Sequence, residues 1–445
     1  MAKYDCFALF ELLDKEDRQE VERSSDLRMS DLESCMARLM DDLGIEGVVR
    51  RIIPNHCYYL VNIELKNVEE YKIIKAAEDR IRQELQVESV RVATPEWRRS
   101  ERKDVNIEIV RNTRRRLYLS RVNSPTTLFR FSASAVTIGR AVNRLPIPIN
   151  LEDGLLIAGK EQAEIRNCIN SIVLSLICTL SPNDLELRLT GNEIFKNFEG
   201  IPHLYGTGDL KGTYKEVKQE YDARKKLFAE AGCRSITEYN GMKRFFEESQ
   251  LPQQVWVIDD INDGKDYDAE ILREIAINGK EIGFIVIAGC RDMSSSRFAV
   301  LSEIFKNRVA FRADSREESL KFPGIEGAEK LVGDGDMLYS TPLRTIRMLN
   351  ANVSSEEIAR VVKYLRENYR SMQSKNDDED IYETVLSIVR LKRLISAMYI
   401  TRRFGVKAAK AEEIIRRLCE SGYCEMTGEG PVLRAVLKEE HRRRS

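Results

Sequence analysis

The stretch Leu155-Leu156-Ile157-Ala158-Gly159 decides the fold class, because it is a short, continuous apolar run that ends in glycine and precedes a helical pattern. Three further apolar runs alternate with helical stretches and lie at 185–189, 255–258 and 284–288. Such runs are typical of strands covered on both faces, and their alternation with helices indicates a parallel sheet. The sequence therefore predicts an α/β domain over residues 124–372.

The segments on either side of this domain follow other patterns. Residues 47–123 predict strand, amphipathic helix, strand and strand, which describes a small α+β domain. Residues 1–46 form a leader with helical spacing of apolar residues, for which a docking helix is the plain interpretation. The polar residues 373–380 predict a linker, and 381–445 predict helices followed by a β-hairpin.

Composition excludes several classes of protein. The chain has 445 residues, with 71 Lys+Arg against 72 Asp+Glu, so its whole surface cannot be a basic nucleic-acid clamp, although local basic patches remain possible. Nine cysteines without a C-x-x-C motif and three histidines predict free thiols and no metal site. No apolar run reaches the ~18 residues of a membrane helix. We therefore expect a cytoplasmic protein without a membrane segment.

Further motifs occur in a fixed order after the opening stretch. They are Gly200-Ile201-Pro202-His203-Leu204, Glu220-Tyr221-Asp222-Ala223-Arg224-Lys225-Lys226-Leu227-Phe228, Val257-Ile258-Asp259-Asp260 and Gly335-Asp336-Met337-Leu338-Tyr339. In this order and spacing they resemble the motor region of the FtsK/SpoIIIE family of double-stranded DNA translocases. The resemblance covers about residues 47–437. It implies an α domain at 47–123, a RecA-like, P-loop-type β domain at 124–372 and a winged-helix γ domain at 381–445.

The phosphate loop departs from the family pattern. The motif G-x-x-x-x-G-K-[ST] needs glycines for backbone N–H groups, a lysine for the outer phosphates and a hydroxyl for Mg²⁺. Here Gly159 and Lys160 open the stretch, but Glu164, Ile165 and Arg166 replace the second glycine, the lysine and the hydroxyl. These losses predict that the chain binds nucleotide at least ~10³-fold more weakly than a protein with an intact phosphate loop. If any nucleotide site survives, Gly159, Lys160 and Arg166 are its candidate residues.

The other catalytic positions are altered too. Asp259 and Asp260 match the family's Walker B aspartate and catalytic glutamate, with the second carboxylate one methylene shorter. Their alternative interpretation is two acidic residues at the exposed edge of a sheet. Cys290 replaces the sensor glutamine, and Asn278-Gly279-Lys280-Glu281 lacks the expected arginine. We therefore predict vestigial carboxylates, no ATPase activity and no cofactor.

Two basic clusters are candidates for nucleic-acid binding. By resemblance, the predicted winged helix contributes Arg402, Arg403, Lys407, Lys410 and Arg417, although Glu412 and Glu413 occupy positions where the family carries polar groups that contact bases or phosphates. The small domain contributes Arg114, Arg115 and Arg116, which could instead be a solvated loop. We expect weak, strongly salt-dependent binding of double-stranded DNA.

Three functions remain open at this stage. The first is an inactive pseudo-ATPase that forms a ring or scaffold on DNA, as a homo-oligomer or beside an active paralogue. The second is an active translocase with a non-standard phosphate loop, which would require ATP and Mg²⁺. The third is a protein-interaction adaptor without DNA binding.

Overall fold

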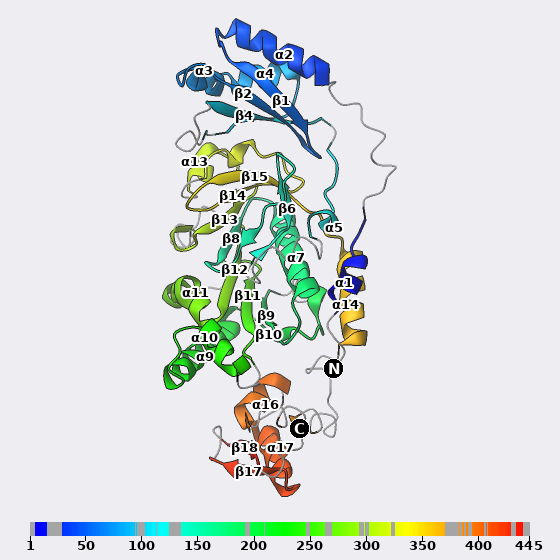
Figure 1. The fold of residues 1–445 in the computed structure, drawn as a ribbon, viewed down its shortest axis with the longest axis vertical. Helices are drawn as coiled ribbons and strands as arrows, with labels where there is room; N and C mark the ends of the chain where they lie inside the picture. Colours follow the sequence, from blue (N-terminus) through cyan, green and yellow to red (C-terminus); the bar gives the residue numbers. More distant parts are fainter. Residues whose placement is uncertain are drawn as a thin grey trace.

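A computed structural model gives the architecture (Figure 1). Its described residues are 5–15, 29–93, 95, 103–112, 114–123, 135–191, 196–208, 210–245, 250–262, 269–292, 298, 302–321, 325–369, 382, 385–386, 389, 394–404, 406, 408–428 and 433–438. A small α+β domain, a large α/β domain and a C-terminal unit follow one another along the longest axis of the molecule (Figure 1).

The large domain is built on a nine-stranded sheet. Its spatial order is β10 (Leu204–Gly208), β9 (Leu185–Thr190), β11 (Gln253–Ile258), β12 (Phe284–Cys290), β8 (Leu155–Ala158), β13 (Asn307–Ala310), β14 (Asp336–Ser340), β15 (Thr345–Asn350) and β6 (Gly139–Ala141). In this spatial order, the strands from β10 through β9, β11, β12 and β8 to β13 are parallel to one another. The pairs β13–β14, β14–β15 and β15–β6 are antiparallel. The predicted α/β fold with a RecA-like parallel sheet is confirmed, and all four predicted apolar runs are strands of this sheet.

Helices cover both faces of the sheet, which explains why the strands are apolar throughout. Leu155 and Ile157 of β8 belong to the core beneath α7 (Gln162–Thr179) and α14 (Ser355–Asn368). Leu156 and Ala158 belong to the core on the opposite face. That face is covered by α9 (Leu210–Glu230), α10 (Ile236–Phe245) and α11 (Ala269–Ile282) (Figure 1).

The small domain contains a four-stranded antiparallel sheet and three helices on one core. The strands lie in the order β1 (Val48–Pro54), β2 (Tyr58–Glu64), β4 (Asp104–Val110) and β3 (Val90–Val92). The helices are α2 (Met29–Asp42), α3 (Glu70–Ala76) and α4 (Glu78–Leu85). The sequence predicts one amphipathic helix in this domain between its first two strands, but the structure has two helices there, α3 and α4, because the backbone breaks at Ala77. The two residues on either side of this break, Lys75 and Glu78, form hydrogen bonds with the main chain of Val92. These contacts with β3 stabilise the break.

The N-terminal segment is divided between two cores. Helix α1 (Cys6–Glu11) buries Leu9 and Phe10 in the core of the large domain, whereas α2 packs on the small sheet. Asp14 pairs with Arg360 (2.5 Å) and accepts a hydrogen bond from the Ser354 hydroxyl (2.8 Å), which ties this segment to α14. At the start of α14, Ser354 and Glu357 form a capping box.

The C-terminal unit contains a three-stranded antiparallel sheet and two described helices. The strands lie in the order β16 (Leu394–Ser396), β18 (Arg434–Leu437) and β17 (Cys424–Thr427), and α16 (Ala397–Phe404) and α17 (Ala408–Glu420) pack beside them. The winged-helix assignment and the domain boundaries remain proposals. Among the helices that the structure describes, none combines the length and apolar character needed to cross a bilayer.

Candidate nucleotide site

Three parallel strands bring the candidate nucleotide-site residues to one edge of the large sheet. In the register, Ala158 of β8 pairs with Cys290 of β12, and Ala288 of β12 pairs with Ile258 of β11. Gly159, Arg291 and Asp259 therefore follow the carboxyl ends of three neighbouring strands. This edge is where open parallel α/β sheets bind their ligands.

The connection between β8 and α7 is too short for a phosphate loop. In the family pattern, five residues separate the first glycine from the lysine that starts the helix. Here α7 begins at Gln162, so only Gly159, Lys160 and Glu161 link strand and helix. Ile165, at the lysine position, is therefore the fourth residue of α7 and lies fully buried in the core. Backbone that would curl around phosphates is instead helical.

Gly159 has a packing role that explains its presence without a phosphate. A Cβ atom at this position would lie 2.6 Å from Cβ of Phe311, which is closer than real contacts allow. The neighbouring Lys160 points to Asp314, with 2.6 Å between Nζ and Oδ1. Two of the three candidate nucleotide-binding residues, Gly159 and Lys160, therefore contact the segment after β13.

Glu164 occupies the position of the second glycine and contacts a tight turn. Its Oε1 accepts a hydrogen bond from the backbone N–H of Gly335 (3.2 Å). That turn has three consecutive residues with positive φ: Gly333 (83°), Asp334 (56°) and Gly335 (90°). Burial raises the pKa of Glu164 to about 7, and the nearby charges of Asp336 and Asp334 act in the same direction.

The two Walker B carboxylates are each paired with an arginine of the same chain. Arg166, in α7, lies 3.2 Å from Oδ2 and 3.4 Å from Oδ1 of Asp259. Arg291, after β12, pairs with Oδ2 of Asp260, whose other oxygen accepts from the backbone N–H of Asn262 (3.0 Å). Both carboxylates are nearly fully buried, with side-chain exposures of 4%. Guanidinium groups thus stand beside the oxygens that would bind a metal ion through water.

The sensor position is also closed. Cys290 is buried, its thiol accepts from the Asn262 amide (3.4 Å), and burial raises its pKa to about 12. Lys280, in the segment without the family's arginine, pairs with Asp153 (3.1 Å). Taken together, these residues do not fit Mg·ATP. The backbone that would surround the phosphates is helical, the lysine position holds Ile165, and each Walker B carboxylate is paired with an arginine.

The nucleic-acid candidates lie in two separate places. Arg114 is committed to Glu88 (2.7 Å), Asp334 (3.4 Å) and the Val332 carbonyl (2.9 Å), so it links the two domains. Arg115 is partly buried and Arg116 is exposed.

In the C-terminal unit, Lys410 pairs with Glu413 (3.1 Å), and the Arg417 guanidinium lies over the Tyr382 ring at 4.4 Å. Arg402 and Arg403 lie on α16, but their side chains are outside the described part of the structure, as is all of Lys407. The DNA-binding assignment of this unit therefore stays a prediction.

Sequence reasoning missed Arg291 and Asp314 as partners at the sheet edge. A signal was present for Arg291, because it lies three positions after the predicted strand 284–288 and so near the carboxyl end of a parallel strand, as Asp259 does. No local signal pointed to Asp314, which reaches Lys160 across 154 positions of sequence.

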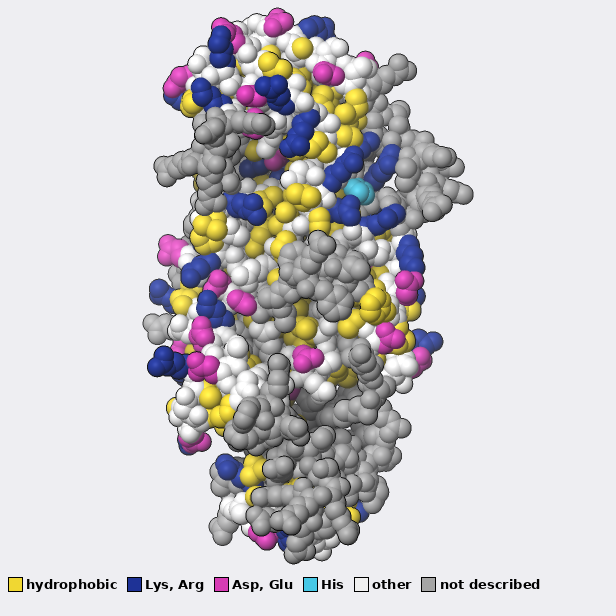
Figure 2. All heavy atoms as spheres, in the orientation of Figure 1, with side chains coloured by type: hydrophobic (Ala, Val, Ile, Leu, Met, Phe, Trp, Pro, Cys, Tyr) yellow, Lys and Arg dark blue, Asp and Glu magenta, His cyan; other side chains and the backbone are white. Residues whose placement is uncertain are grey.

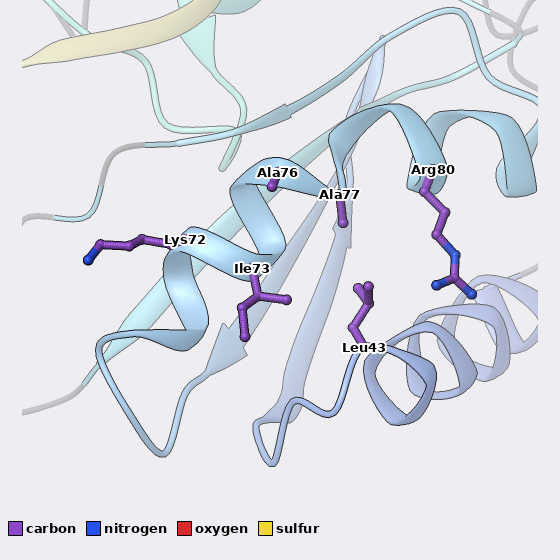
Figure 3. Close-up of a pocket in the computed structure, with 6 residues that line it drawn as sticks. All are labelled: Leu43, Lys72, Ile73, Ala76, Ala77 and Arg80. Atoms are coloured by element: carbon purple, nitrogen blue, oxygen red, sulfur yellow. The ribbon is translucent and has the colours of Figure 1, made fainter.

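A groove in the small domain is separate from this site (Figure 3). Leu43, Ile73, Ala76 and Ala77 line it, with Lys72 and Arg80 at its ends. Lys72 pairs with Glu69 (2.9 Å) and Arg80 pairs with Asp42 (2.7 Å). The two basic groups of the groove therefore have acidic partners in the chain and do not indicate a charged ligand.

Comparison with known proteins agrees with this geometry. The FtsK/SpoIIIE family model matches residues 134–330, which hold the sheet edge described above. The large domain is an FtsK/SpoIIIE-type domain. It is 27% identical over 451 residues to the DNA translocase FtsK of Clostridium acetobutylicum, with 91% of this chain and 57% of that protein aligned. It is 30% identical over 296 residues to FtsK of Caldanaerobacter subterraneus, with coverage of 60% and 41%.

The chain spans about half the length of the curated relatives it matches. Solved structures with similar folds include the type VII secretion ATPase EccC of Thermomonospora curvata (TM-score 0.46, 21% identity), covering 54% of this chain and 32% of that one. The pCW3 conjugation coupling protein TcpA with ATPγS gives a TM-score of 0.46 at 14% identity, with coverage of 75% and 99%.

Proposed function

We propose that this chain is a catalytically inactive FtsK-like pseudo-ATPase that acts as a DNA-associated scaffold subunit, in a homo-oligomer or beside an active paralogue. The observation that carries the proposal is the pairing of both Walker B acids with arginines of the same chain, Arg166 and Arg291. These pairs place guanidinium groups where Mg²⁺ would need to bind.

The phosphate loop supports the same proposal on independent grounds. Ile165 cannot exchange with a lysine without placing an ammonium group in the core. A carboxylate near the phosphates, such as that of Glu164, opposes binding by ~3 kcal/mol at about 5 Å and an effective dielectric near 20. Together these effects correspond to at least ~10³-fold weaker binding, since each ~1.4 kcal/mol is tenfold.

Isothermal titration of the full chain with Mg·ATP tests the proposal. We expect no saturable binding at concentrations where an intact FtsK/SpoIIIE motor, used as the positive control, is saturated. Binding tighter than about 100 µM, near −5.5 kcal/mol, would contradict it. So would DNA-stimulated phosphate release that disappears in the variant Asp259→Ala, because the acid would then be catalytic rather than vestigial.

The scaffold role is tested by association. We expect the chain to copurify with itself or with an FtsK-type homologue that has an intact phosphate loop. A monomer under all conditions, with no such partner, would contradict the scaffold role and favour an adaptor that binds unrelated proteins.

A further inference from the structure

The first described segment of the chain, residues 5–15, packs on the large domain, although the chain continues into α2 of the small domain (Figure 1). We call this segment the N-terminal strap. Its side chains Leu9, Phe10 and Leu13 are 0%, 8% and 3% exposed and belong to the same core as α7 and α14. Helix α1 has six residues, which is too short for a helix to be stable alone in water. The structure of the strap therefore depends on its docking.

Asp14 is the polar anchor of the strap. Its carboxylate pairs with Arg360 (2.5 Å) and accepts a hydrogen bond from the hydroxyl of Ser354 (2.8 Å). Its backbone N–H donates to Oε1 of Glu357 (2.9 Å), and its carbonyl accepts from the hydroxyl of Ser120 (2.5 Å). The end of the strap is thus held mainly by the first turns of α14.

This anchor places two acidic side chains beside one arginine. Glu357 is fully buried, and the same serine that donates its hydroxyl to Asp14 donates its backbone N–H to Glu357 (3.4 Å). Burial raises the pKa of Glu357 to about 7; the charge of Asp14 acts in the same direction and that of Arg360 acts against it. Cys178 of α7 also faces Glu357, but burial raises the pKa of its thiol, which therefore stays uncharged.

The surface around the strap has no excess of one sign of charge. Figure 2 shows acidic and basic side chains mixed over the side of the large domain where α1 and α14 lie. A change of pH near neutrality therefore acts on the strap through the local cluster around Glu357 and not through a surface of one charge.

We propose that the N-terminal strap is a pH-controlled latch, which stays docked on the large domain while Glu357 holds a proton and detaches when Glu357 is ionised. A buried carboxylate next to a second carboxylate is costly because water cannot solvate it. Detachment removes Asp14, admits water to Glu357 and leaves Arg360 free to pair with it. The strap is the part that yields, since it is short and is held by its docking alone.

The direction of the effect follows from the protonation of Glu357. The docked state holds this proton more tightly than the detached state, because the pKa is raised from 4.5 to about 7. The contribution of Glu357 to docking is therefore complete below about pH 4.5 and is lost as the pH rises through about 7. Above that pH the chain loses one of its links between the two domains, whereas the direct contact of Arg347 with Glu108 (3.6 Å) remains.

Hydrogen exchange of the full chain, followed by mass spectrometry from about pH 6 to about pH 9, tests the latch. The measured quantity is the amide protection of residues 5–15, corrected for the pH dependence of intrinsic exchange. We expect this protection in wild type to fall by up to about tenfold for each pH unit above about 7. Glu357→Gln keeps the acceptor for both N–H groups and suits a capping box, but it cannot ionise, so its strap protection should stay constant.

Glu356→Gln, at the exposed neighbouring position on α14, is the matched control and should follow wild type at each pH. The amides of β11 in the same samples report whether the large domain itself remains folded. Constant strap protection in wild type, or an equal fall in Glu357→Gln, would overturn the proposal, because Glu357 would then not control docking. A simultaneous loss of protection in the strap and β11 would also overturn it, since the strap would not detach separately.

Discussion

The guanidinium of Arg166 lies 3.2 Å from a carboxylate oxygen of Asp259, and this pair joins the start of α7 to the end of β11. In a working phosphate loop the same two positions would be joined through Mg²⁺ by a hydroxyl and an aspartate. The chain therefore supplies its own cation at the edge of the sheet. The side chain of Asp259 is 4% exposed, so its partner is Arg166 rather than solvent water.

The first prediction concerns this pair. The substitution Arg166→Ala leaves the buried Asp259 without its arginine, and we expect it to lower the free energy of unfolding by about 1–3 kcal/mol. Adding Asp259→Asn removes the stranded charge, so the double variant loses less than the sum of the single variants. Urea unfolding of all three measures this coupling.

Lys160→Ala is the matched control, because it breaks an exposed pair with Asp314 that is worth at most about 1 kcal/mol. If Arg166→Ala were no more harmful than this control, or the two site variants were additive, the buried pair would not have the role assigned here.

The second prediction concerns repair of the phosphate loop. The triple variant Glu164→Gly/Ile165→Lys/Arg166→Thr restores the motif letters, but it also buries an ammonium group where Ile165 packs. We expect a lower melting temperature and no phosphate release with Mg·ATP and DNA. Ile165→Val, as the packing control, loses only about 0.5–1.5 kcal/mol. A stable triple variant that hydrolyses ATP would show that the short loop can rearrange.

The third prediction is a pH dependence. The pKa of Glu164 is raised to about 7, mainly by burial, so the folded protein binds this proton more tightly than the unfolded chain, whose value is 4.5. The stability due to this group is therefore complete below about pH 4.5 and is lost as the pH rises through about 7. Glu164→Gln keeps the acceptor for Gly335 and cannot ionise. Its melting temperature should exceed that of wild type by an amount that grows from pH 5 to pH 8.

The exposed Glu161→Gln, three residues earlier, serves as the control for this experiment. Its melting temperature should follow that of wild type at each pH. A constant difference between Glu164→Gln and wild type across the range would mean that Glu164 titrates like an exposed carboxylate.

The fourth prediction concerns the contact between the small and large domains. Arg347, fully buried on β15, pairs with Asp336 (2.6 Å) and approaches Glu108 of the small domain (3.6 Å), while the Tyr58 hydroxyl donates to Asp336. Arg347→Met leaves the buried Asp336 without its arginine, whereas Glu108 keeps its pair with Arg91 (2.9 Å), and the substitution should destabilise by about 3–5 kcal/mol. Tyr58→Phe removes one hydrogen bond and should cost about 0.5–1.5 kcal/mol.

Urea unfolding monitored together with limited proteolysis measures this difference. We expect Arg347→Met to expose the segment 114–123, which follows the small domain, to cleavage before the large sheet unfolds, whereas Tyr58→Phe leaves this segment protected. Equal effects of the two substitutions would indicate that the arginine contributes no more than the tyrosine.

The sequence by itself determined the local structure and the loss of the phosphate-binding groups. Apolar runs such as 155–158 specify buried strands, and Ser354 with Glu357 specifies a helix start, because burial periodicity and capping depend on neighbours a few positions away. The replacement of lysine by Ile165 was equally plain, since it follows from residue type at a fixed spacing.

Only the tertiary structure decided which charges meet. Arg166 and Asp259 are 93 positions apart, and Lys160 and Asp314 are 154 apart. Their pairing depends on the strand order, which places β8 between β12 and β13. Ion pairs and charged surfaces join residues through space, and local patterns do not encode the order in which strands assemble.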